Sequence, residues 1–204
     1  MEIDANVSAD GVVYLHHDDG LERCTNGNGY LVNTTAAELD KLDAGSWHSD
    51  AFRGEPLARF TELMLFADQH QLGVNVEIKP TAGWEIPATD AICELLRQWP
   101  AHAPLLVSSF STLSLQRARA LLPDVATGLL VAAIPDNWQA LMHEYNCQTF
   151  HCASDFLDAE RLQVFRNADV PVLTYTVNDR QRAEDLKAWG VTSLFSDCPS
   201  ELGS

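Results

Sequence analysis

Residues 72–80 read Leu-Gly-Val-Asn-Val-Glu-Ile-Lys-Pro, and this short stretch decides the fold. It is largely apolar and ends at a proline, which predicts a buried strand. Residues 56–73 precede it with a helical stripe of apolar side chains, and residues 87–100 follow it with the same spacing. The stripe of the first helix consists of Leu57, Phe60, Met64 and Ala67. A strand between two amphipathic helices is the repeating unit of α/β folds.

The same alternation continues to the end of the chain. Further strands are predicted at residues 104–110, 125–134, 147–152, 170–178 and 191–197. Helices are predicted between them at residues 111–123, 137–146, 158–169 and 179–190. The strands are apolar throughout, which is typical of a parallel sheet covered by helices on both faces. The opening residues 1–4 add a seventh strand, so we expect a (β/α) barrel with one strand fewer than the eight of a TIM barrel.

Residues 6–56 interrupt this rhythm. They are rich in Gly, Asn, Thr and Asp and contain no long helical pattern. We expect an inserted cap of short strands and turns near the mouth of the barrel, after the strand that opens the chain. Residues 1–204 are otherwise expected to form a single barrel domain.

Composition narrows the possible partners and compartments. The 204 residues carry a formal net charge of −16, which argues against nucleic acid or an anionic membrane surface as the main partner. The five cysteines form no C-x-x-C pair, so they are expected to be reduced thiols in a cytoplasmic protein. No apolar run is long enough to span a bilayer.

Acidic side chains recur at predicted strand ends, where barrel active sites lie. Glu2 and Asp4 are two residues apart and therefore face the same way, as do Glu77 and Lys79. Three carboxylates form a site for a hard divalent cation, Mg²⁺ or Ca²⁺, and a lysine beside it indicates an anionic ligand, most simply phosphate. The alternative is an ordinary ion pair between Glu77 and Lys79 at a strand end.

A histidine pair supplies the second group of candidates. His16 and His17 follow an apolar run and precede Asp18 and Asp19, so one carboxylate could orient an imidazole for proton transfer. Spacing does not choose between the two histidines, and a solvated loop histidine is the common alternative. Phe110 and Tyr175 lie at or near predicted strand ends.

Taken in order, these segments resemble the glycerophosphodiester phosphodiesterase family, especially its bacterial cytosolic members. The similarity rests on "EIDANVSADGVVYLHHDDGLERCTNGNG", "DAGSW", "GEPL", "NVEIKP", "LLVSSF", "YTVND" followed by "QRAEDLKAWGV", and "SDCP". It extends from residue 2 to about residue 199. The resemblance implies a TIM barrel of the phospholipase-C-like phosphodiesterase type. It also implies cleavage of glycerophosphodiesters, such as glycerophosphocholine, to sn-glycerol 3-phosphate and an alcohol.

The resemblance also implies roles for individual residues. The metal ligands, for Mg²⁺ or Ca²⁺, correspond to Glu2, Asp4 and Glu77. Lys79 corresponds to the residue that faces the phosphate. His17, rather than His16, corresponds to the histidine of the family's H-D motif, the general acid for the leaving alcohol. Phe110 and Tyr175 correspond to positions that line the substrate pocket.

The chain departs from the family at its beginning. The family's first strand carries H-R-G, followed by P-E-N-T, and neither motif occurs in this sequence. We therefore expect a barrel that lacks its first βα unit, with an open edge beside the strand of Glu2 and Asp4 that could allow self-association. Without the second histidine and the arginine we expect impaired turnover. Two alternatives remain: a non-catalytic relative that binds a phosphodiester or a metal, and a phosphodiesterase for lysophospholipids.

Overall fold

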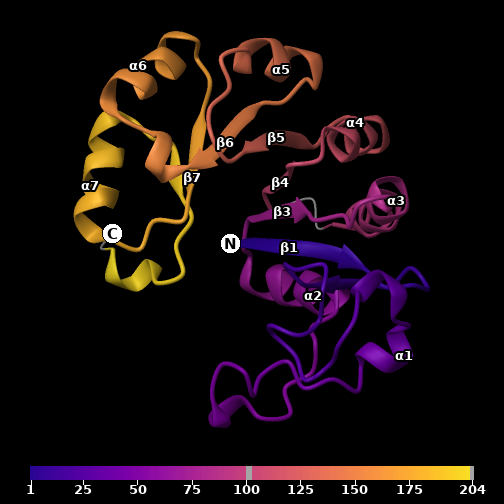
Figure 1. Ribbon diagram of the computed structural model, residues 1–204. Helices are drawn as coiled ribbons and strands as arrows, with labels where there is room; N and C mark the ends of the chain where they lie inside the picture. Colours follow the sequence, from indigo (N-terminus) through magenta and orange to yellow (C-terminus); the bar gives the residue numbers. More distant parts are fainter. Residues whose placement is uncertain (100–102, 203–204) are drawn as a thin grey trace. The chain divides into compact units, whose positions relative to one another are not determined.

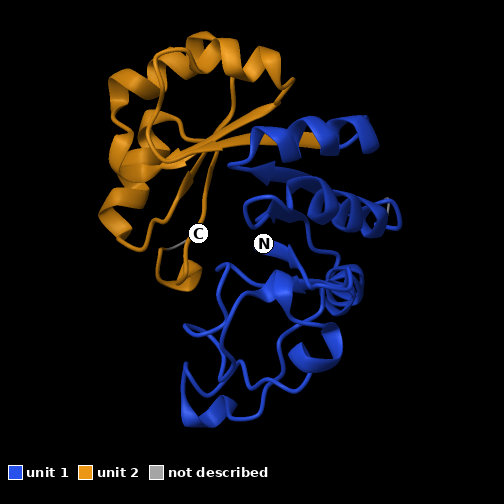
Figure 2. Ribbon diagram, turned by 45° about the vertical axis from the view of Figure 1, so that its right-hand side comes forward, with its two compact units in different colours: residues 1–125 blue, residues 126–204 orange. Residues whose placement is uncertain are grey.

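The computed structural model describes residues 1–99 and 103–202. The chain forms two compact units, residues 1–125 and residues 126–204 (Figures 1 and 2). Each unit repeats the predicted alternation of strand and helix, and neighbouring long strands within a unit are parallel. This is the α/β arrangement of TIM-barrel folds, as the sequence predicts. That residues 1–204 form one domain stays a prediction.

The first unit is built on four strands in the order β2-β1-β3-β4. Their bounds are β1 Glu2–Val7, β2 Val13–Leu15, β3 Val74–Ile78 and β4 Leu105–Ser109. The helices that follow them are α2 Phe60–His70, α3 Glu85–Leu96 and α4 Thr112–Leu121. One face of β3, with Val74, Val76 and Ile78, packs in a buried core with apolar side chains from all three helices. The alternate residues of β3 therefore face away from these helices, and these are the polar ones.

An excursion between β1 and α2 corresponds to the predicted cap. It contains β2, the short helix α1 (Ala36–Leu39) and two 3₁₀ turns at Leu31–Asn33 and Asp50–Phe52. A second buried cluster lies within it, formed by Tyr14, Leu21, Leu31, Ala36, Leu39 and Leu57. The Tyr14 hydroxyl donates to Asp40 Oδ1 over 2.7 Å, so the polar end of this buried ring has a hydrogen-bond partner at the edge of the cluster.

One sequence expectation about β1 is wrong. Its edge is not open over Ala5–Val7, because β2 pairs there antiparallel, with Ala5 opposite Leu15 and Val7 opposite Val13. The chain reverses between the two strands at Gly11, whose φ of 84° suits glycine. A strand of three residues is too short to give a periodic signal, so the pairing was not visible in the sequence.

The second unit contains the four strands β5 Ala126–Val131, β6 Thr149–Ala153, β7 Val172–Tyr175 and β8 Ser193–Leu194, in that order. Its helices are α5 Trp138–Glu144, α6 Ala159–Asn167 and α7 Arg180–Trp189, with 3₁₀ turns at Ser154–Phe156 and Pro199–Glu201. Trp138, Phe150 and Phe165 stack in its core, with ring centroids 4.1–5.8 Å apart. Gly190, at φ 101°, ends α7 in the left-handed conformation that glycine adopts readily.

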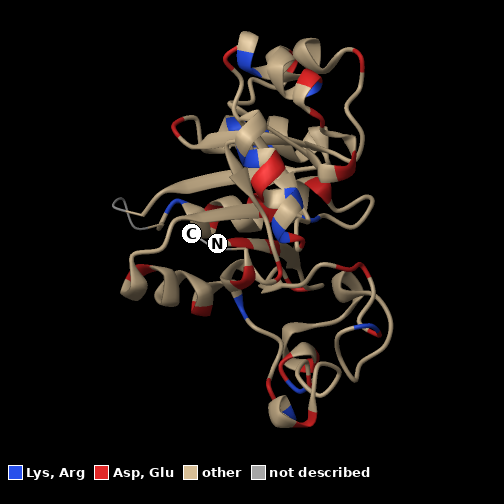
Figure 3. Cartoon of the chain, turned by 90° about the vertical axis from the view of Figure 1, so that its left-hand side faces the viewer, with Lys and Arg blue, Asp and Glu red and all other residues tan. Residues whose placement is uncertain are grey.

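Charge is distributed along the whole chain. Figure 3 shows Asp and Glu spread over helices and loops of both units rather than gathered in one segment. Among residues 1–99 and 103–202, no helix combines the length and apolar character that crossing a bilayer requires.

Candidate active site

Three carboxylates meet on the polar face of the first unit. Strands β1 and β3 are parallel neighbours, and their register places Asp4 opposite Glu77 and Glu2 opposite Asn75. Residues two apart on a strand share a face, so Glu2, Asp4 and Glu77 converge. One oxygen from each lies within 4.8 Å of the other two. The structure therefore brings together the acidic residues that the sequence singled out.

Burial makes this cluster electrostatically costly. Glu77 is only 7% exposed, and burial raises the pKa of its carboxyl, with the Asp4 charge adding to the effect and Lys79 opposing it. Burial, together with the charges of Asp4 and Glu77, raises the pKa of Glu2 to about 7. Carboxylates held together in this way favour either protonation or a bound cation.

The donor set fits a hard divalent cation. All three ligand atoms are carboxylate oxygens, the type that Mg²⁺ and Ca²⁺ prefer. Glu77 Oε1 is buried, and the Lys79 ammonium lies 3.2 Å from it. A single ammonium does not neutralise three carboxylates held this close together, so the cluster can accept further positive charge. The residues present can thus hold a divalent ion.

Lys79 continues the polar face of β3 just beyond the end of the strand. Its Nζ lies 3.2 Å from Glu77 Oε1, 3.8 Å from Asp4 Oδ1 and 3.0 Å from His17 Nε2. The same ammonium lies 5.6 Å from the centroid of the Phe110 ring. Lys79 therefore connects the carboxylates to the candidate acid–base histidine. The ion pair between Glu77 and Lys79 that the sequence offered as an alternative is present, but Lys79 also contacts Asp4 and His17.

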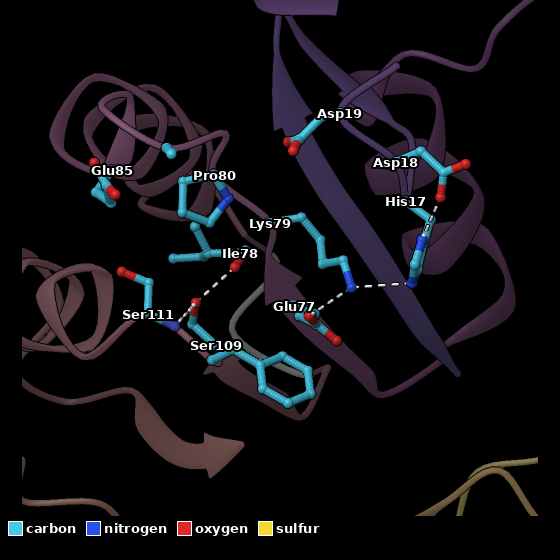
Figure 4. A pocket seen from close by; sticks show the side chains of 12 residues that line it. His17, Asp18, Asp19, Glu77, Ile78, Lys79, Pro80, Glu85, Ser109 and Ser111 are labelled. Carbon is cyan, nitrogen blue, oxygen red and sulfur yellow. Dashed lines mark hydrogen bonds and ion pairs between the residues drawn. The ribbon is translucent and has the colours of Figure 1, made fainter. Parts of the chain in front are cut away.

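The two neighbouring histidines have different environments. His16 is buried, and its Nε2 contacts the Gly20 carbonyl oxygen over 2.8 Å. His17 is exposed and faces Lys79 through Nε2, while its Nδ1 lies 2.6 Å from Asp18 Oδ1 (Figure 4). Asp18 in turn accepts from Arg23, which holds the pKa of the Asp18 carboxyl well below its usual range. His17 is thus the histidine with an orienting carboxylate.

Of the residues described above, His17, Asp18, Glu77, Lys79 and Phe110 line one pocket of the first unit, with a volume of about 680 Å³. Figure 4 shows Glu77, Lys79 and His17 linked in a row, with Ser109, Ser111 and Glu85 on another part of the wall. The full lining is His17, Asp18, Asp19, Glu77, Ile78, Lys79, Pro80, Ala82, Glu85, Ser109, Phe110 and Ser111. Both Phe110 and Lys79, predicted to contact substrate, are therefore pocket residues, and their roles there stay predictions.

Tyr175 belongs to the second unit, at the end of β7. Its hydroxyl donates to the Val131 carbonyl over 2.7 Å, and its contact with substrate stays a prediction. Arg23 stands in the "HDDGLER" part of the sequence, where no local pattern indicated a role for it. Nor did any pattern indicate that the Thr81 hydroxyl donates to Asp19, over 2.7 Å and across 62 positions of sequence. Such contacts join residues that are distant in the sequence and depend on how the cap folds, so no local sequence pattern reveals them.

Comparisons with known proteins identify the family of this chain. The model of the glycerophosphoryl diester phosphodiesterase family matches residues 1–201. A glycerophosphodiester phosphodiesterase of Bacillus subtilis is 26% identical over 215 residues, covering 98% of this chain and 73% of the relative. One from Caldanaerobacter subterraneus is 24% identical over 205 residues, covering 99% and 83%.

Among solved structures, a phosphodiesterase of Oleispira antarctica is similar to this chain with a TM-score of 0.96 and 38% identity, covering 98% of this chain and 82% of that one. That structure is a complex with the product sn-glycerol-3-phosphate. The match of fold and sequence extends over nearly all of the chain that carries the carboxylates, the lysine and the oriented histidine. This chain belongs to the glycerophosphoryl diester phosphodiesterase family.

Proposed function

We propose that this chain is a metal-dependent phosphodiesterase that hydrolyses glycerophosphodiesters, such as glycerophosphocholine, to sn-glycerol 3-phosphate and an alcohol. Family membership and the product bound to the Oleispira antarctica relative support this activity. The observation that carries it is the convergence of three carboxylates, one ammonium and one carboxylate-oriented imidazole at a single polar face. Each of these groups has a use in splitting a phosphodiester.

Glu2, Asp4 and Glu77 are proposed to hold the divalent cation, either Mg²⁺ or Ca²⁺. The close approach of their oxygens and the burial of Glu77 support this assignment. When bound, such an ion supplies charge neutralisation for the phosphoryl oxygens of the substrate. Without a cation, Lys79 gives only partial compensation, since one ammonium faces two carboxylates at 3.2 and 3.8 Å.

Lys79 is proposed to bind the phosphate, and Phe110 and Tyr175 to line the substrate pocket. An ammonium beside a phosphate oxygen stabilises negative charge as it develops in the transition state. Phe110 is 45% exposed beside Lys79, so an apolar surface is available next to the charged group. The glycerol carbons or the methyl groups of a choline can pack on such a ring.

His17 is proposed to transfer the proton that the leaving alcohol needs. In the reaction the bond between phosphorus and the alcohol oxygen breaks, water supplies a hydroxyl to phosphorus, and a proton is added to the alcohol oxygen. His17 Nε2 faces Lys79, whose ammonium has only donors, so Nε2 accepts in this arrangement. His17 must therefore take up a proton at Nε2 before it donates one to the alcohol.

Three coarser proposals accompany the activity. Residues 1–204 are proposed to act as one barrel domain, with residues from about 6 to 56 as its cap. The cytoplasm is proposed as the compartment, because all five cysteines are free thiols, as is common in a reducing environment. Self-association through the part of β1 not paired with β2 also remains a proposal.

The activity is tested by incubating the purified chain with glycerophosphocholine and Mg²⁺ or Ca²⁺, and by measuring glycerol 3-phosphate with phosphorus NMR. Because the sequence contains no H-R-G motif, the assay uses high enzyme concentration and long incubation. We expect Glu77→Gln to lower turnover by about 100-fold or more, since the charge at the phosphoryl group is then less compensated. Full turnover in EDTA, or in Glu77→Gln, would refute the metal assignment.

Glu94→Gln is the matched control, because Glu94 is an exposed acid of α3 that pairs with Arg97 away from the pocket. It should leave turnover unchanged. Cation binding that depends on Glu77 without any product would instead indicate a non-catalytic relative. Faster release from a lysophospholipid than from glycerophosphocholine would favour the lysophospholipid alternative.

A further inference from the structure

Arg23 grips Asp18 with two parallel hydrogen bonds. Its Nε lies 2.5 Å from Asp18 Oδ2, and its Nη2 lies 2.8 Å from Oδ1. This forked geometry fixes the plane of a carboxylate, which a single contact does not do. Arg23 side-chain exposure is 57%, so the pair stands at the surface, where ion pairs add little to folding stability.

The loop that carries Arg23 is itself held in place. Leu21 is buried, and its backbone N–H donates to the Gly29 carbonyl over 2.9 Å. The Thr25 hydroxyl donates to the Leu21 carbonyl over 2.6 Å, and His16 Nε2 contacts the Gly20 carbonyl. These contacts on both sides of Arg23 limit the movement of its backbone. The guanidinium can therefore act as a fixed support for Asp18.

Asp18 uses the same oxygen to bind the imidazole. Its Oδ1 accepts from Arg23 and lies 2.6 Å from His17 Nδ1. An ionised carboxylate only accepts, so Nδ1 carries the proton in this contact. At the other side of the ring, His17 Nε2 lies 3.0 Å from Lys79 Nζ, which only donates. Both partners thus select one neutral tautomer, with a proton on Nδ1 and a lone pair on Nε2.

We propose that Arg23 is a positioning residue that, by fixing Asp18, sets the tautomer and ring orientation of His17. This rests on the proposed function insofar as His17 is the proton-transfer group. Arg23 contributes no group to the pocket lining and acts only through Asp18. Without Arg23, the Asp18 carboxylate would rotate and present its oxygens to water. His17 would then lose its partner at Nδ1 and keep only Lys79, at Nε2, to distinguish its two ring nitrogens.

The two parallel hydrogen bonds from Arg23 to Asp18 predict that different substitutions at position 23 disturb His17 to different degrees. Lysine keeps the positive charge at position 23 but offers a point charge instead of two aligned N–H groups. Glutamine removes the charge and leaves at most one donor toward Asp18. Arg23→Lys should therefore retain part of the wild-type behaviour, and Arg23→Gln should lose it. A role of Arg23 in charge alone would make the lysine variant fully equivalent to wild type.

The test is long-range proton–nitrogen NMR of the histidine rings in the full chain at pH 8, with the His17 signals assigned by their loss in His17→Gln. We expect the Nδ1–H tautomer in wild type, a mixture with the Nε2–H tautomer in Arg23→Gln, and an intermediate mixture in Arg23→Lys. Arg97→Gln is the matched control, because it breaks another exposed arginine–carboxylate pair of the same unit. An unchanged His17 tautomer in Arg23→Gln overturns the proposal.

Kinetics give a second, independent readout. We expect Arg23→Gln to lower kcat by about 10-fold with little change in KM, the scale typical of residues that orient a functional ligand. Unfolding of Arg23→Gln is checked by circular dichroism, and Arg23→Lys keeps the test valid if glutamine is not tolerated. Absence of product with every variant, while the tautomer still responds to Arg23, would count against the proposed function and not against the positioning role. Equal kcat and equal tautomer in Arg23→Gln and wild type would count against the positioning role alone.

Discussion

Replacing Lys79 with methionine should strengthen cation binding while weakening anion binding. The Lys79 ammonium occupies the space between Glu77 and Asp4, at 3.2 Å and 3.8 Å from their oxygens. A divalent ion held by the same oxygens must lie close to this positive charge. Methionine has a similar length and no charge, so Lys79→Met removes the repulsion with little loss of packing.

The size of the effect follows from the geometry. Two unit charges about 4 Å apart interact by about 1 kcal/mol in water and about 4 kcal/mol at an effective dielectric constant near 20. A divalent ion doubles these values. The Lys79 side chain is only 20% exposed and partly buried charges are screened less, so the water value of about 2 kcal/mol is the minimum expected. About 2 kcal/mol corresponds to an increase in Mg²⁺ affinity of about 30-fold.

The assay is calorimetric titration of the full chain with Mg²⁺ and, separately, with inorganic phosphate. It is run at pH 8.5, because the Glu2 carboxyl, with a pKa raised to about 7, is then ionised. Lys41→Met, which removes an exposed lysine of the cap, serves as the control and should leave both affinities unchanged. Mg²⁺ affinity that stays constant or falls in Lys79→Met would refute the reasoning, as would unchanged phosphate binding.

Two further predictions concern pH. Mg²⁺ affinity should rise about tenfold between pH 6 and pH 8, because the Glu2 carboxyl with a pKa of about 7 must lose its proton to bind the ion; calorimetry at several pH values checks this, and a flat profile contradicts it. His151 is fully buried and desolvation lowers its pKa to about 4, so the unfolded chain binds a proton more readily than the folded chain as the pH falls below 6.5. His151 should therefore lower the free energy of unfolding by about 1–3 kcal/mol between pH 6.5 and pH 4. Urea denaturation checks this: the free energy of unfolding should fall less steeply with pH in His151→Gln than in the control variant His143→Gln. Equal slopes in the two variants would show that His151 is not responsible.

The repeating part of the fold was readable from local patterns. The apolar pattern identified the six strands β3 to β8, because strands of a parallel sheet are buried on both faces and leave a clear hydrophobic signal. The opening strand β1 was predicted from residues 1–4 without such a signal, and it extends further, to Val7. The acidic cluster was predictable only in part. Same-face spacing groups Glu2 with Asp4, but β1 continues to Val7, so these two residues lie in the first half of the strand and not at its end.

The contacts of the cap were not predictable in the same way. The pairing of β2 with β1 involves only three residues, and the contact between His17 and Lys79 joins positions 62 residues apart. The role of Arg23 depends on a loop whose path is set by buried Leu21 and by turns, not by periodicity. Spacing could not separate His16 from His17 because their difference lies in burial, and burial follows from the tertiary course of the loop.

Two of the buried clusters of the first unit support different parts of the site. The main cluster supports β1 and β3, which carry the carboxylates, whereas Leu21 and Tyr14 of the cap cluster support the loop that carries His17. On the proposed roles of His17 and the three carboxylates, changes in cap packing would alter proton transfer more than cation affinity. Substitutions confined to the cap, whether natural or from a directed library, would therefore adapt the enzyme to new leaving alcohols while the carboxylates of β1 and β3 stay unchanged.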